Sequence, residues 1–213
     1  MKLFPFEIKH LFCIIVLFLC LGCGPKIGQS GFLDNYDNLK ESDANKTMLS
    51  YVNSNFEKGK YKKLMVDNII TKFGEKAKGN KVDEEKLNEL TSFFKSEIIK
   101  LLSTDYDIVD EPGEDVAQIQ IAITEIVPGK LFSNIFPISV AVNTATGRNK
   151  GGAALEMKVV DSQTKELLGQ AIDNRKNRSN IKSFSKYGNS RGVMTYWAGL
   201  LKDRIDYFKS KAN

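Results

Sequence analysis

The chain has 213 residues, and its 31 lysines and arginines exceed its 26 aspartates and glutamates, giving a formal net charge of +5. This length is typical of one domain with enough interior to fold without disulfide bonds, and the small basic excess favours solubility without selecting a partner. The single histidine and all three cysteines lie within the first 23 residues, so the rest of the chain lacks the commonest catalytic and metal-binding side chains.

The first residues have the three parts of a secretory signal. Lys2 and Lys9 supply positive charge, residues 11–19 form an apolar run, and the sequence CLGC follows at residues 20–23. The run is shorter than the roughly 20 apolar residues needed to cross a bilayer. This pattern resembles a bacterial lipoprotein signal, in which the chain is cut before a cysteine that receives lipid. We therefore predict lipid attachment at Cys23, although Cys20 stands where such signals usually have leucine or valine.

Two other interpretations of this stretch stay open. A conventional signal peptide cut after Gly22 fits the small side chains at Cys20 and Gly22, and an uncleaved anchor is the third. The lipoprotein interpretation divides the chain into a removed signal peptide (residues 1–22), a lipid-anchored tether (residues 23–31) and a single domain (residues 32–213).

The expected location is the cell envelope, with the domain held to membrane lipid through Cys23. Gly24 follows the cysteine, where an aspartate would often signal retention in the inner membrane. We therefore expect the outer membrane, with the domain facing the periplasm.

Cleavage before Cys23 would also remove His10, Cys13 and Cys20. The mature chain would then contain no histidine, and its one cysteine would carry lipid. This excludes Ser-His-Asp triads, Cys-His pairs, sites built from histidine and cysteine for zinc, and disulfide bonds. We expect no cofactor and no metal.

The first predicted elements of the domain are a strand and a helix. Residues 61–73 (YKKLMVDNIITKF) are rich in apolar and β-branched side chains, which predicts a buried strand. A helix follows with Asp83 as its N-cap and with Val82 and Leu87 at the spacing of a hydrophobic staple. Its apolar stripe repeats at three- and four-residue steps and consists of Leu87, Leu90, Phe94, Ile98 and Leu101.

A first antiparallel hairpin is predicted after this helix. Residues 106–109 would pair with residues 116–127 through a turn at residues 111–114 (EPGE). In the second arm isoleucine alternates with glutamine, which indicates a strand with one buried face.

A second hairpin is predicted to join residues 153–160 to residues 166–172 through a turn at residues 161–165 (DSQTK). Residues 128–152 separate the two hairpins. The apolar part of this segment fits a strand, a buried loop or a membrane-facing loop, and its end is rich in glycine and threonine.

The chain ends in a predicted helix that follows a basic loop at residues 175–191. Its apolar face comprises Val193, Trp197, Leu201, Ile205 and Phe208, at the spacing of a helix packed on a sheet. Trp197 is expected in the core rather than as a ligand platform. The order of elements predicts an α+β fold: a mixed, mainly antiparallel sheet with two principal helices on one face.

Several segments together resemble a family of bacterial lipoproteins catalogued only as a domain of unknown function. They are Gly31-Phe32-Leu33 with Tyr36 and Leu39; Tyr61-Lys62-Lys63 before Val66-Asp67; residues 161–166 (DSQTKE); and Trp197-Ala198 with Leu201, Arg204 and Ile205. The resemblance implies an exported α+β domain on a lipid anchor and supplies no activity. The chain departs from the pattern at Asn68, where the family often has proline, and at Lys165, where it often has glycine, which reaches positive φ more easily.

The basic loop is the first candidate binding segment. Its cationic side chains are Arg175, Lys176, Arg178, Lys182, Lys186 and Arg191. They are expected either to be solvated or to contact an anionic partner of the envelope, such as lipid head groups or cell-wall carboxylates. A nucleic-acid partner is not expected outside the cytoplasm.

Acidic and glycine-rich stretches offer weaker candidates. The acids between residues 105 and 115 match no calcium loop and are expected to form a turn around Pro112-Gly113. Residues 74–81 fall short of a phosphate-binding loop because no serine or threonine follows the last lysine. Paired carboxylates could act on glycans, and the acids on or beside strands are Glu125, Glu156, Asp161 and Asp173.

These observations predict a non-catalytic binding or scaffold component of the cell envelope. One alternative is a carboxylate-dependent hydrolase of cell-wall glycan. The other is a small-ligand binding protein that uses the apolar segment 128–142, which a closed hydrophobic cavity would favour and a filled core would count against. The partners left open are an envelope protein, the cell wall and anionic lipid.

Overall fold

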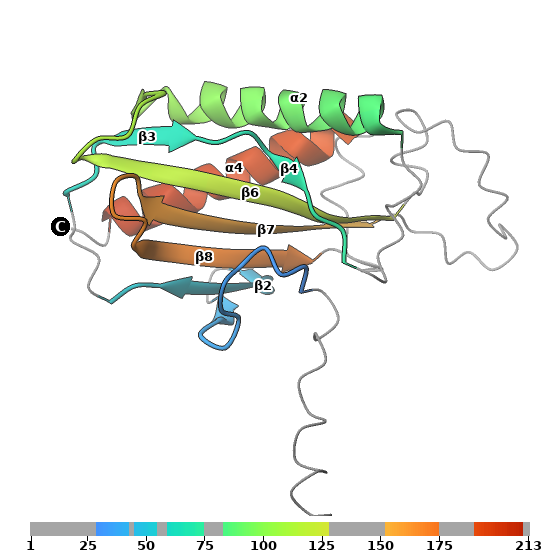
Figure 1. The fold of residues 1–213 in the computed structure, drawn as a ribbon, viewed down its shortest axis with the longest axis horizontal. Coiled ribbons are helices and arrows are strands. Elements are labelled where there is room, and N and C mark those ends of the chain that lie inside the picture. The colour runs from blue at the N-terminus through green and yellow to red at the C-terminus, as the bar shows by residue number, and fades with distance from the viewer. Residues whose placement is uncertain are drawn as a thin grey trace, which may run out of the picture.

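The computed structural model describes residues 29–42, 45–54, 59–74, 83–127, 152–174 and 190–210. Within these ranges an eight-stranded sheet carries two helices on one face (Figure 1). The strands are β1 (Lys40–Ser42), β2 (Asn45–Val52), β3 (Lys63–Val66), β4 (Ile70–Thr71), β5 (Asp107–Ile108), β6 (Val116–Val127), β7 (Gly152–Asp161) and β8 (Leu167–Asn174). The helices are α2 (Glu84–Leu102) and α4 (Ser190–Ser210).

The sheet is mixed and mainly antiparallel, with the strand order β1-β2-β8-β7-β6-β3-β5. Strands β1, β2, β8, β7 and β6 pair antiparallel in this order, whereas β3 is parallel to both β6 and β5. The short strand β4 also pairs parallel with β6. This architecture confirms the predicted α+β class with two helices on one face.

The middle of the sheet follows the predicted alternation. In β6 the side chains of Ala117, Ile119, Ile121 and Ile123 belong to the core beneath the helices. An irregularity between Ile123 and Glu125 shifts the register against β7. Because one extra residue reverses the facing of the residues after it, Ile126 joins the core and Glu125 lies on the other face.

Helix α2 begins as predicted, because the Asp83 side chain accepts a hydrogen bond from the amide of Glu85 at 2.9 Å. Its stripe is buried through Ile98, but the last core position is Leu102 (0% exposed) rather than Leu101, which is half-buried. Helix α4 packs against α2, where Phe94 meets Trp197 with ring centroids 5.9 Å apart. Trp197 is 1% exposed, so its predicted place in the core is confirmed.

Two strand predictions were wrong. Residues 61–73 form two short strands, β3 and β4, rather than one. Between them the Asp67 amide still donates to the Ile119 carbonyl of β6 at 3.0 Å, and the Asp67 carboxylate accepts hydrogen bonds from Gln118 (2.7 and 2.8 Å) and Gln120 (2.8 Å). Residues 106–109 do not form a hairpin with β6: β5 pairs with β3, which lies between them.

Strand β2 was not predicted, and it forms one side of the sheet with β1. The second hairpin, β7–β8, is confirmed. The segment 128–151, residues 75–82 including Val82, and the basic loop up to residue 189 lie outside the described residues. No described helix has both the length and the apolar character that crossing a bilayer requires.

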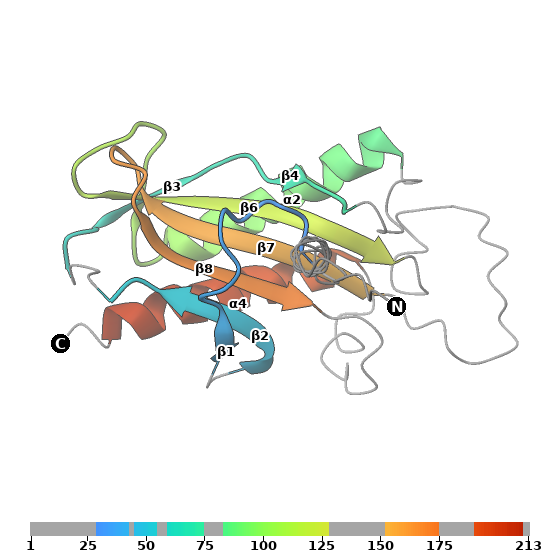
Figure 2. The same cartoon turned by 60° about the horizontal axis from the view of Figure 1, so that its bottom comes forward.

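The face of the sheet opposite the helices carries residues 29–39, here called the strap (Figure 2). Glu156 is fully buried (0% exposed) beneath the strap and accepts hydrogen bonds from the Ser30 amide at 2.8 Å and the Tyr36 hydroxyl at 2.7 Å. Lys158 forms an ion pair with Asp34 at 3.0 Å. The fold therefore already includes Ser30, within the predicted tether.

Candidate functional site

A cavity of about 700 Å³ lies on the helix side of the sheet, under the second half of α4. Strands β2, β8, β7 and β6 form its floor, and α4 forms its roof. The aliphatic side chains that line it are Met48, Val52, Leu64, Ala117, Ile119, Met157, Val159, Leu168, Ala171, Leu201 and Ile205. Its volume falls within the range of about 300–1,000 Å³ that is usual for small-molecule sites.

The cavity arises because two helices do not cover the whole sheet. The seven strands of the main path span about 29 Å at a spacing of about 4.8 Å, whereas two helices about 10 Å wide cover about 20 Å. Helix α2 runs along the β3 side of the sheet (Figure 1). Val159 is consequently only half-buried, although it lies on an interior strand and faces the helices.

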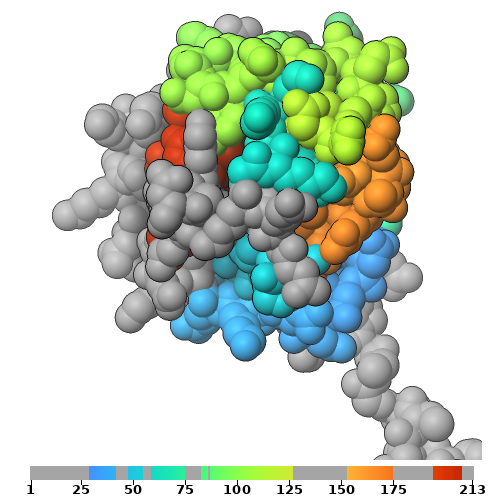
Figure 3. Space-filling model, turned by 90° about the vertical axis from the view of Figure 1, so that its left-hand side faces the viewer, coloured from blue at the N-terminus to red at the C-terminus, as the bar shows by residue number. Residues whose placement is uncertain are grey.

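The rim of the cavity includes Gly59, Tyr61 and Lys62, which precede β3. Figure 3 looks onto this end of the molecule, where the teal segment beginning at residue 59 lies between the orange β7–β8 hairpin and the red helix α4. Lys62 on this rim is exposed, and Tyr61 beside it is half-buried.

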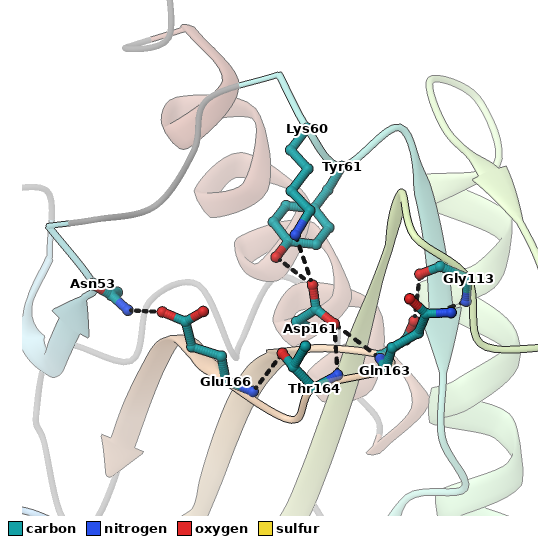
Figure 4. A network of polar contacts seen from close by, with 9 residues as sticks. Asn53, Lys60, Tyr61, Gly113, Asp161, Gln163, Thr164 and Glu166 are labelled. Atoms are coloured by element: carbon teal, nitrogen blue, oxygen red, sulfur yellow. Dashed lines mark hydrogen bonds and ion pairs between the residues drawn. The ribbon is translucent and has the colours of Figure 1, made fainter.

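Asp161 at the end of β7 holds this rim in place (Figure 4). Its carboxylate accepts a hydrogen bond from the Tyr61 hydroxyl at 2.8 Å and pairs with the Lys60 ammonium at 3.1 Å. The Thr164 amide, the Tyr61 hydroxyl and the Lys60 ammonium hold the pKa of Asp161 well below its usual range, against the opposing effect of burial. The pKa of Lys60 is raised, chiefly by its hydrogen bond to Asp161.

The β7–β8 turn ties further segments to the same end of the sheet. Ser162 exchanges hydrogen bonds with the backbone of Gly113 at 2.9 and 3.0 Å. Glu166 accepts one from Asn53 at 3.1 Å (Figure 4). Lys165 takes the positive φ of 63° that glycine would adopt more easily. Its ammonium donates to the Gln118 side chain at 2.8 Å.

On the other side of the cavity, residues 105–106 are bound to α4. The Tyr106 hydroxyl donates to Asp206 at 3.2 Å, and Lys202 pairs with Asp206 at 2.8 Å and also with Asp105. Burial, followed by the Asp206 charge, raises the pKa of Tyr106 to about 12. The wall formed by Arg204 and Ile205 is thereby fixed to the segment that follows α2.

The structure does not gather the acids that were considered as a catalytic set into one cluster, although Glu125 and Glu156 share one face of neighbouring strands. Glu125 and Glu156 lie on the strap face, Asp173 faces the helices, and Asp161 lies at the end of β7. Asp115 pairs with Lys63 at 3.1 Å. In the part of the chain that the structure describes, no three histidine, cysteine or acidic side chains are placed to hold a metal ion.

The other predicted site residues cannot be placed. Cys23 and the basic residues from Arg175 to Lys186 lie outside the described residues, and of Arg191 only the backbone, in α4, is described. Sequence reasoning missed the cavity. One feature of the sequence could have indicated it. Three of the four segments that resemble the family line the cavity or hold its rim: residues 61–63, the turn at residues 161–166, and Leu201 with Arg204 and Ile205.

Solved structures with similar folds share little sequence with the chain. A DUF4136 family protein from Bacteroides thetaiotaomicron is 8% identical over 81% of this chain and 98% of its own, with a TM-score of 0.41. The PelC dodecamer from Paraburkholderia phytofirmans is 8% identical over 70% of this chain and 94% of its own, with a TM-score of 0.35. No curated protein matches the sequence.

The resemblance to a family of unknown function agrees with a comparison of the whole chain against family models. A family model matches the chain over residues 28–201, which includes the strap, all eight strands, α2 and the first part of α4. The chain therefore belongs to the family described as "Protein of unknown function (DUF3313)".

Proposed function

We propose that this protein is an exported envelope lipoprotein, anchored through Cys23, whose domain binds a small apolar ligand without catalysis. The observation that carries the proposal is the cavity of about 700 Å³ with its aliphatic floor. Burial of apolar ligand surface there would supply roughly 25 cal/mol for each Å² removed from water.

The cavity favours ligand binding over the other functions that the sequence left open. A scaffold role requires no internal space, and glycan hydrolysis requires two carboxylates beside the substrate. The aliphatic floor between Met48 and Leu201 instead offers surface to an apolar molecule. The described walls come from the sheet and α4 rather than from segment 128–142.

The anchor is supported by the sequence around Cys23 and by the shortness of the apolar run before it. Metabolic labelling with palmitate tests it: the wild-type protein should be labelled, and the Cys23→Ser variant should not. Absence of label on the wild-type protein, with unchanged membrane association of the variant, would reject the anchor and leave the cavity proposal standing.

Binding is tested with the mature chain without lipid, residues 24–213, which contains every described residue. Nile red, a neutral apolar dye, should bind with one site per chain and fluoresce. Val159→Phe should abolish this signal because its ring occupies the cavity. The matched control is Leu49→Phe, which adds the same ring at an exposed position on the strap face. Equal binding by both variants would reject the cavity as the site.

Glycan hydrolysis is the competing outcome. Release of fragments from purified peptidoglycan by the wild-type protein, lost on amide substitution of a single acid, would replace binding with catalysis. The acids to substitute are Glu125, Glu156, Asp161 and Asp173.

A further inference from the structure

The size of the cavity limits its ligand. A cavity of 150 Å³ accommodates benzene, which corresponds to about 25 Å³ for each non-hydrogen atom, so 700 Å³ accommodates about 28 such atoms. A fatty acid of about 16 carbons has about 18 non-hydrogen atoms, whereas a two-chain phospholipid has about 50. A single long chain therefore fits, and a two-chain lipid does not.

The register of the floor gives the cavity a long axis. Val52, Gly169 and Val159 form one row across the sheet, and Ser50, Ala171 and Met157 form the next. Met48 lies one row further from the rim, opposite Asp173, which does not line the cavity. Four residues separate Met48 from Val52 along β2, or about 14 Å at about 3.4 Å per residue. A chain would lie along the strands, with its apolar end near Met48.

The opposite end of this axis is polar and carries a positive charge. Lys62 and Arg204 are the cationic side chains of the lining, and Asp105 is its acid. Lys202 pairs with both Asp105 and Asp206 and offsets one of these two charges, so Lys62 and Arg204 leave an excess of one positive charge. Lys62 is exposed and makes no ion pair within the described residues. An anionic head group at the rim would therefore be attracted, and a cationic one repelled.

We propose that the cavity binds a single-chain anionic amphiphile, with its alkyl chain over the β2–β8 floor and its head group at Lys62. This inference rests on the proposed function, because it specifies the chemistry of the same cavity. The shared chemistry is that of a free fatty acid and of a lysophospholipid, and the assay separates these two sources.

The test is displacement of Nile red from the mature chain by four ligands below their critical micelle concentrations. Palmitate and a palmitoyl lysophosphatidylglycerol should displace the dye at least fivefold more effectively than hexadecanol, and hexadecylamine should be the weakest. The more effective of the two anions identifies the source. Two-chain phosphatidylglycerol in vesicles should not displace the dye from the cavity.

Charge variants complete the test. Lys62→Gln should weaken palmitate roughly fivefold and leave hexadecanol unchanged, since only the head-group attraction is lost. Lys100→Gln is the control, because it removes the same charge from an exposed position on α2 that does not line the cavity. Equal affinity for palmitate and hexadecanol, with no effect of Lys62→Gln, would overturn this inference but leave the proposed function intact. Failure of Nile red itself to bind would overturn both.

Discussion

Ala171 provides a direct test of whether the cavity is empty space. It lies on β8, faces the helices opposite Met157, and lines the cavity at 8% exposure. Ala171→Leu adds three carbon atoms there. At about 0.8 kcal/mol for each buried methylene the gain is at most about 2.4 kcal/mol, and the more compact real unfolded state reduces it to about 1.5 kcal/mol.

The control is Ala153→Leu. Ala153 also faces the helices, on β7, and is 1% exposed in the core, but it does not line the cavity. Three extra carbons in a packed position cost about 1–3 kcal/mol through overpacking. The two substitutions are chemically identical, so the difference between them isolates the space available at each site.

Urea unfolding followed by Trp197 fluorescence measures both free energies of unfolding. In thermal unfolding, Ala171→Leu should raise Tm by about 4 °C, since about 1 kcal/mol shifts Tm by about 2–4 °C in a domain of this size. It should also reduce Nile red binding. If it destabilises the protein as much as Ala153→Leu does, the space beneath α4 is filled and the reasoning from the cavity is refuted.

Three further predictions concern the polar contacts around the sheet. Asp161→Asn should lower the free energy of unfolding at pH 7 by about 3 kcal/mol, because buried charge-assisted hydrogen bonds are lost. Since the pKa of Asp161 is depressed in the fold, the stability of the wild type should fall as the pH drops below about 4. Urea unfolding at pH 7 and pH 2.5 should show a smaller loss of stability between these pH values in the variant than in the wild type. Tyr36→Phe should lower the free energy of unfolding by about 1–3 kcal/mol, because buried Glu156 loses a hydrogen-bond donor. Urea unfolding measures this loss, and proteolytic cleavage within residues 29–39 should become faster. An unchanged cleavage rate would contradict a role of Tyr36 in holding the strap. The pKa of Tyr106 is raised to about 12, so its contribution to stability should be fully present below pH 10 and should be lost as the pH rises toward 12. Spectrophotometric titrations of the wild type and of Tyr106→Phe should differ by one tyrosine that ionises above pH 11.

Sequence patterns predicted the elements whose own periodicity is strong. The alternation in β6 and the stripe from Leu87 to Ile98 each repeat over several turns or pairs, so local burial and fold agree. Strand β5 has only two residues and no alternation to detect. It pairs with β3, which lies about 40 residues earlier in the chain, and a pairing between such distant segments cannot be predicted from local sequence.

Strand β2 was missed for a related reason. Its helix-facing positions are Met48, Ser50 and Val52, so a serine interrupts the apolar alternation. Ser50 lines the cavity, where a polar side chain is not forced against packed aliphatic groups. The cavity therefore permits a serine at a helix-facing position of β2, and this serine interrupts the apolar alternation that predicts a strand.

The candidate site itself was only partly predictable. The turn at residues 161–165 was expected, but Asp161 was considered as a possible catalytic acid rather than as the group that holds Lys60 and Tyr61. These residues are about 100 positions apart, and only the sheet brings them together. The cavity depends on how far two helices extend over seven strands, which is a property of packing rather than of any one segment.

The strap lies between the proposed anchor and the sheet, on the face opposite the proposed binding site. It meets β7 at Glu156, and Asp161 beside the rim lies five residues further along the strand, or about 17 Å at about 3.4 Å per residue. Ser30 lies seven residues after Cys23, so the chain between them reaches at most about 25 Å. A lipid on Cys23 would thus leave the rim within reach of the membrane surface. The short tether, which would hinder a partner that binds far from the membrane, suits a ligand that is taken from it.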